Sequence, residues 1–134
     1  MPSTTNIPAN APRQTVAILL AASLLTSAVH FVDNAFHLDL YPGPVWLTRN
    51  NVLLAWLILP VLAWFAYRGR SKTPLLAYAL LGFAGFAHYL APHPHAMPLR
   101  CAATIFGEAI ASAVLIAYVL FITPSNQVAI NSSR

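Results

Sequence analysis

Acidic residues are almost absent from this chain, which has three among its 134 residues. Residues of either charge make up only 7% of the sequence, whereas soluble domains contain about 25%. So little charge excludes an ordinary water-soluble surface. The seven basic residues give a net charge of +4 but follow no single helix face, so the sequence predicts no nucleic-acid partner.

Cysteine is scarcer still. The single cysteine, Cys101, excludes a disulfide within the chain and leaves a free thiol, an intermolecular bridge or a soft metal ligand open. Apolar residues are what the chain has in abundance: 58% of the sequence is hydrophobic, and the mean hydropathy is +0.65. This composition predicts an integral membrane protein.

Four apolar runs, separated by segments rich in proline and charge, predict the fold. We expect transmembrane helices over about residues 15–37, 51–68, 73–91 and 98–123. They would form an all-α, antiparallel up-down bundle in a single domain, 15–123. Residues 1–14 and 124–134 lack apolar periodicity, which predicts a disordered N-terminal tail and a polar C-terminal tail.

The first run is also compatible with a cleaved signal peptide, because Arg13 precedes its apolar core and small residues follow at 26–28. If the run stays in place, both termini lie on one side of the membrane. The flanks of that side hold Arg13, Arg68, Arg70, Lys72 and Arg134, and those of the other side hold Arg49 and Arg100. This imbalance predicts a plasma (inner) membrane protein with cytoplasmic termini and with loops 38–50 and 92–98 outside.

Proline and glycine inside the runs predict local geometry. Pro60 leaves the carbonyl of Trp56 without its helical donor, which predicts a kink in the second helix and puts Trp56 where it can wall a pocket. Gly82 and Gly85 present a flat face on which a neighbouring helix can approach closely. A second small-residue seam is formed by Ala103, Gly107 and Ala111.

The ionisable side chains gather toward one end of the predicted bundle. The spacing H-x2-D-x3-H puts residues 30, 33 and 37 on one helix face, with Asn34 beside them. A rise of about 1.5 Å per residue brings His30 level with Glu108 of the fourth run. An ionisable group in hydrocarbon costs about 2.5–3.5 kcal/mol and needs a partner. The candidate ligand or metal pocket is therefore His30, Asp33, Asn34, His37, His88 and Glu108.

This cluster has several interpretations. Imidazole and carboxylate are ligands of zinc and of non-haem iron, so it is a candidate divalent metal site. It is also a candidate polar pocket for a small molecule or lipid, or simply a polar contact between helices. Weaker candidates for a metal, here copper, are His93, His95 and Cys101. Nothing in the spacing identifies a catalytic residue or decides whether the chain is an enzyme.

Some features resemble the four-helix EXPERA domain of the sigma-2 receptor and emopamil-binding protein group. The similar features are Asp33 near the end of the first helix, Tyr41-Pro42 after it, Thr73-Pro74 after a basic turn, and a single acidic residue in the fourth helix. The resemblance implies an intramembrane pocket for a sterol, lipid or amphipathic amine, with Asp33 or Glu108 as counter-ion and without catalysis.

The sequence thus predicts a small four-helix membrane protein with a polar His/Asp/Glu cluster between its first, third and fourth helices. The cluster is expected to open to the outer side. An EXPERA-like binding pocket and a structural or accessory subunit remain alternatives. A homo-oligomer or a partner membrane protein is compatible with each of them.

Overall fold

A computed structural model of the chain describes residues 11–40, 46–69, 71–90 and 98–122, and these residues form helices and no strand. The all-α prediction is confirmed. The longer helices are α1 (Ala11–Phe36), α2 (Arg49–Trp56), α3 (Ile58–Arg68), α4 (Lys72–Leu81) and α5 (Leu99–Ala117). Short 3₁₀-helices η1 (Leu38–Leu40) and η2 (Ala84–Leu90) follow α1 and α4, and a π-helical turn, η4 (Tyr118–Ile122), follows α5.

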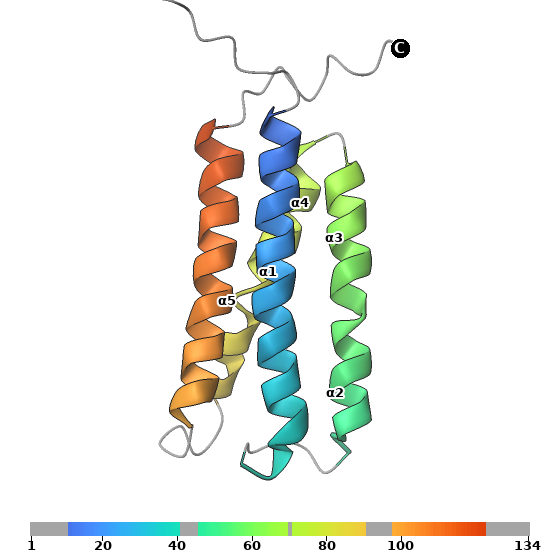
Figure 1. The fold of residues 1–134 in the computed structure, drawn as a ribbon, viewed down its shortest axis with the longest axis vertical. Coiled ribbons are helices and arrows are strands. Elements are labelled where there is room, and N and C mark those ends of the chain that lie inside the picture. The colour runs from blue at the N-terminus through green and yellow to red at the C-terminus, as the bar shows by residue number, and fades with distance from the viewer. Residues whose placement is uncertain (1–10, 41–45, 70, 91–97, 123–134) are drawn as a thin grey trace, which may run out of the picture.

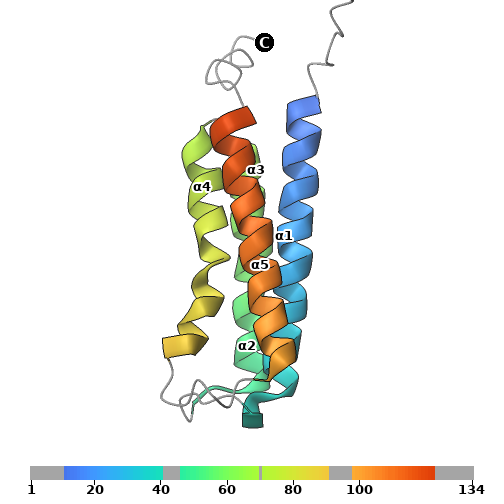
Figure 2. The ribbon, with the colours of Figure 1, turned by 90° about the vertical axis from the view of Figure 1, so that its left-hand side faces the viewer.

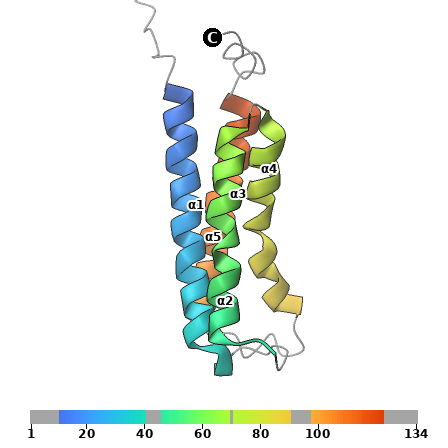
Figure 3. The ribbon, with the colours of Figure 1, turned by 90° about the vertical axis from the view of Figure 1, so that its right-hand side faces the viewer.

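Four stretches of the described chain are long and apolar enough to cross a membrane, as predicted: Arg13–Phe36, Arg49–Arg68, Lys72–Leu90 and Leu99–Phe121. They pack side by side, and the chain passes down α1, up α2 and α3, down α4 and η2, and up α5 (Figures 1, 2 and 3). We call the end of the bundle where α1 begins and α5 ends the terminal end. The opposite end, with η1, is the loop end.

The second span is broken where proline predicts a kink. The α2 helix ends at Trp56 and α3 begins at Ile58, and the amide of Leu57 bonds the carbonyl of Leu54 at 3.1 Å in place of a longer-range α-helical bond. Beside the break, residues of the second span and of α1 enclose an apolar groove of about 280 Å³. Its lining is Ala28, Phe31, Val32, Leu53, Leu54, Trp56 and Leu57, so Trp56 does line a cavity.

The third span departs from the single helix predicted over 73–91. It is α-helical only as far as Leu81, after which Gly82 begins the change to the 3₁₀ segment η2. Both glycines make the predicted close approach. A Cβ atom on Gly82 would overlap the Ser112 hydroxyl of α5, and one on Gly85 would lie 2.8 Å from His30 Cε1 of α1. The change from α-helix to 3₁₀-helix thus occurs where the backbone of the third span lies close to both α5 and α1.

The other small-residue seam is not used within the described bundle. A Cβ atom on Gly107 would meet no atom within 4 Å, and Ala103 is exposed. The described chain therefore packs no helix on Gly107.

The two ends of the bundle differ in what fills them. Toward the terminal end lies the larger apolar core: Val16, Leu20, Ala63, Ala66, Tyr78, Ala79, Leu115 and Val119. Toward the loop end the apolar core is reduced to Cys101 and Ile105 with Phe86 packed on them. Ala35 and Val52 are also buried toward that end, beside the buried polar side chains of His30 and Glu108.

Candidate functional site

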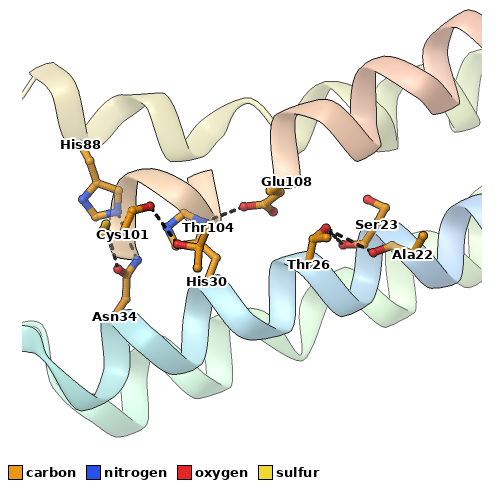
Figure 4. Close-up of polar contacts among 9 residues, drawn as sticks. All are labelled: Ala22, Ser23, Thr26, His30, Asn34, His88, Cys101, Thr104 and Glu108. Carbon is orange, nitrogen blue, oxygen red and sulfur yellow. Dashed lines mark hydrogen bonds and ion pairs between the residues drawn. The ribbon is translucent and has the colours of Figure 1, made fainter. Parts of the chain in front are cut away.

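The deepest polar contact joins α1 to α5. His30 Nδ1 lies 2.6 Å from Glu108 Oε2, and the two side chains are only 3% and 6% exposed. Figure 4 shows them pointing toward each other from the two helices. Helix counting assigns equal depths to His30 and Glu108, in agreement with this contact. The contact gives each buried polar group a hydrogen-bond partner, which lowers the cost of burying it.

A second contact lies beside the pair, toward the loop end. Asn34 Nδ2 donates to His88 Nε2 at 3.1 Å, and the Cys101 thiol donates to Asn34 Oδ1 at 3.8 Å. The rings of His88 and His30 are 5.6 Å apart between centroids. Because His88 accepts through Nε2, this ring is an uncharged imidazole in the arrangement seen here. Segments from all three predicted helices, α1, η2 and α5, therefore meet at this level.

Asp33 belongs to the rim rather than to the buried level. Its Oδ1 lies 3.1 Å from Arg100 Nε and 3.3 Å from His37 Nδ1, and His37 Nδ1 also donates to the Asp33 carbonyl at 2.9 Å. Arg100 and His37 hold the Asp33 carboxylate at this rim, apart from the His30–Glu108 pair. The His37 side chain, 37% exposed, lies beside Asp33 at this rim.

The metal-site interpretation is not supported. In the described part of the chain, no group of three or more His, Cys, Asp or Glu side chains is arranged to hold a metal ion. The physical reason is that each candidate carboxylate already has a protein partner: Glu108 has His30, and Asp33 has Arg100 and His37. His93 and His95 lie outside the described residues, so the copper prediction, which needs them beside Cys101, has no structure to be compared with.

Several buried hydroxyl groups extend the site toward the terminal end. Ser27 and Ser112 are 1% and 0% exposed, and their Oγ atoms, like His30 Nε2, have no hydrogen-bond partner among the described residues. In α1, Ser27 lies one turn and Ser23 two turns before His30, and Ser23 is 3% exposed. Sequence reasoning missed Ser23 and Ser27. Their spacing of four, three and four residues to His30 and Asn34 marks one helix face and could have identified them.

Threonines near the site are satisfied locally and take no part in it. Thr26 donates to the carbonyls of Ala22 and Ser23 at 3.2 and 2.9 Å, and Thr104 donates to the carbonyl of Cys101 at 2.9 Å (Figure 4).

We call the buried and half-buried polar row the polar seam: Ser23, Ser27, His30, Asn34, His88, Glu108 and Ser112. It reaches the rim at Asp33 and is closed toward the terminal end by the larger apolar core. The apolar groove beside Trp56 is lined by none of its members. The seam therefore reaches the rim at one end and stops at the larger apolar core at the other.

No family model, curated protein or solved structure matches the chain. The likeness to the EXPERA domain consequently rests on the few residues quoted for it and not on a family match.

Proposed function

We propose that the chain is a small integral membrane protein that binds and releases a proton at the His30–Glu108 pair, reached from the loop end. The observation that carries this proposal is the 2.6 Å contact between two buried ionisable groups on different candidate spans. Ionisable residues inside a membrane are costly and mark sites of function, proton relays among them. The proposed orientation places the terminal end in the cytoplasm.

The chemistry of the pair suits a proton site. With one proton shared across the contact and one on His30 Nε2, the pair has no net charge whether it is written as imidazolium and carboxylate or as imidazole and carboxylic acid. Loss of a proton leaves a net negative charge in the bundle, and gain of one leaves a net positive charge. Either change alters the contact that ties α1 to α5, so the packing of the loop-end half responds to the proton.

Access from the loop end is supported by the order of the polar groups. His37 and Asp33 lie at the rim, His88 and Asn34 come next, and the His88 ring is 5.6 Å from that of His30. The groups that face the pair from the third span are His88 and Tyr78, and Arg100 of α5 is held at the rim by Asp33. Beyond Ser23 the larger apolar core closes the seam, which favours a proton-responsive protein over a proton-conducting one.

A purely structural role explains less. Replacing a buried ion pair by apolar residues is often neutral or stabilising, so a pair retained only to join helices is an inefficient choice. His30 Nε2 is buried and has no hydrogen-bond partner among the described residues, which adds a cost of about 1–3 kcal/mol that a structural role does not explain.

Because the chain has few acidic residues, a carboxyl signal can be assigned to one of them by substitution. The sequence has only Asp33, Asp39 and Glu108, so infrared difference spectra recorded between about pH 4 and 9 can assign a protonating carboxyl group by single substitution. We expect a pH-dependent carboxyl C=O band in the reconstituted full-length protein that disappears in Glu108→Gln. The band should persist in the matched variants Asp33→Asn and Asp39→Asn.

A second arm tests the side of access. In vesicles with the protein in one orientation, the band should follow the pH of the compartment that bathes the loop end and ignore the other. A wild-type protein in which Glu108 shows no pH-dependent band would refute the proton site. A band that follows the pH at the terminal end would refute access from the loop end. Ligand binding and association with a partner protein remain predictions.

A further inference from the structure

Two arginines at the terminal end lie over aromatic rings of a single helix turn. Arg13 Cζ of α1 is 5.8 Å from the centre of the Tyr67 ring, and Arg68 Cζ is 4.8 Å from the centre of the Trp64 ring. Trp64, Tyr67 and Arg68 lie within the last five residues of α3, and this end of α3 packs beside the start of α1 (Figure 1). Both guanidinium groups therefore occupy one corner of the bundle.

Arg13 and Arg68 differ from the two arginines at the loop end, which have oxygen partners within the described chain. There, Arg100 Nε lies 3.1 Å from the Asp33 carboxylate, and Arg49, stacked on Phe36 at 4.5 Å, places its Nε 3.4 Å from the carbonyl of Ala35. Among the described residues, neither Arg13 nor Arg68 has a carboxylate or carbonyl acceptor. Their ring contacts use the face of the guanidinium and leave its N–H edge available.

The positive charge at this corner is not neutralised by any acidic side chain. Of the three acidic residues, Asp33 and Asp39 are at the loop end and Glu108 is buried against His30. Lys72, which begins α4, adds a further cation at the terminal end. An anion from outside the chain is thus the natural partner of this surface.

We propose that the corner formed by Arg13, Trp64, Tyr67 and Arg68 binds the phosphate of an anionic membrane phospholipid. The rings hold the guanidinium planes, whose N–H edges donate to phosphate oxygens. A lipid is a better source than free phosphate because Trp64, 56% exposed, and Tyr67 stand at the end of a candidate span, where aromatic side chains meet lipid headgroups. This proposal needs membrane insertion but not the proton site.

The experiment compares lipid binding by the full-length protein after delipidation in detergent. Dioleoylphosphatidylglycerol and dioleoylphosphatidylcholine are titrated separately, and bound lipid is counted by native mass spectrometry. We expect the wild type to prefer the anionic lipid, and Arg13→Gln/Arg68→Gln to weaken its apparent affinity about 30-fold (about 2 kcal/mol, at about 1.4 kcal/mol per tenfold). Arg49→Gln is the matched control, because Arg49 also stacks on a ring, and it should change affinity by less than about threefold.

Two further measurements separate charge from geometry and lipid from free phosphate. Arg13→Lys/Arg68→Lys retains both charges but not the planar fork, so its affinity should fall between those of the wild type and the glutamine variant. It also provides a folded comparison if the glutamine variant is unstable. Equal binding of both lipids by the wild type, or equal losses in Arg49→Gln and the double variant, would overturn the site. Full displacement of the lipid by millimolar inorganic phosphate would overturn the lipid as its source.

Discussion

The terminal-end and loop-end halves of this bundle are held together in different ways. The terminal-end half packs eight buried residues, almost all aliphatic or small, into a continuous core. The loop-end half has a core of Cys101 and Ile105 and depends on hydrogen bonds between named side chains, above all His30 and Glu108. Packing tolerates conservative change, whereas a buried polar pair fails when either partner is lost.

The two halves also differ in the structure of the third span. In the terminal-end half the third span is an ordinary α-helix, and Tyr78 and Ala79 are buried in the larger core. In the loop-end half the same span is a 3₁₀ segment that meets its neighbours through Gly85, a hydrogen bond from Asn34 and aromatic contacts of Phe86. If the pair changes protonation as proposed, the change would act on the half with less apolar packing.

The largest effect is expected from breaking the polar pair. His30→Ala leaves Glu108 buried without its partner, and we expect a loss of about 3–5 kcal/mol in the free energy of unfolding near neutral pH. Lower pH should restore part of it by neutralising the carboxylate. Unfolding in mixed micelles by increasing sodium dodecyl sulfate measures the loss.

The double variant His30→Leu/Glu108→Leu is the control for this prediction. It removes both buried polar groups and should recover most of the stability while abolishing the pH-dependent infrared band. A single variant as stable as the wild type would mean that the pair does not hold the loop-end half together.

An intermediate effect is expected where the two halves meet. Gly82→Ala would drive a Cβ atom into Ser112, and we expect a loss of about 1–3 kcal/mol from overpacking, measured by the same unfolding assay. Gly107→Ala is the matched substitution into open space and should be neutral or stabilise by up to about 1 kcal/mol. If both variants behave alike, the close approach at Gly82 is not a feature of the folded protein.

The smallest effect is expected at the rim. Arg100→Gln removes an ion pair whose arginine is 45% exposed, so we expect a loss of no more than about 1 kcal/mol that shrinks further in high salt. Unfolding curves at low and high sodium chloride measure it. A salt-independent loss as large as that of His30→Ala would place Asp33 with the buried pair after all.

Much of the fold follows from local sequence features. Apolar run length predicts four spans, Pro60 predicts the break between α2 and α3, and Gly82 and Gly85 predict close contacts. Helical rise alone brings His30 and Glu108 to one depth. Each of these inferences needs only the periodicity of one helix or the geometry of one residue.

What sequence reasoning missed depends on how the helices are rotated against one another. The H-x2-D-x3-H spacing cannot tell that Arg100, from another helix, draws Asp33 to the rim while His30 turns inward. The metal interpretation failed for the same reason, since it assumed that side chains on one face share one target. The 3₁₀ form of η2 depends on contacts with α1 and α5, which no local pattern contains.

The 3₁₀ segment has a consequence for how the third span fits a bilayer. A 3₁₀-helix rises about 2.0 Å per residue against about 1.5 Å for an α-helix, so the seven residues of η2 reach about 3.5 Å farther than they would as α-helix. Lys72–Leu90, at 19 residues the shortest of the four candidate spans, is lengthened by this amount along its axis, in a chain whose proposed hydrocarbon layer is about 30 Å thick. The local tightening of the helix therefore sets the length of the third span, and in a membrane any rearrangement of η2 into α-helix would shorten that span relative to the bilayer.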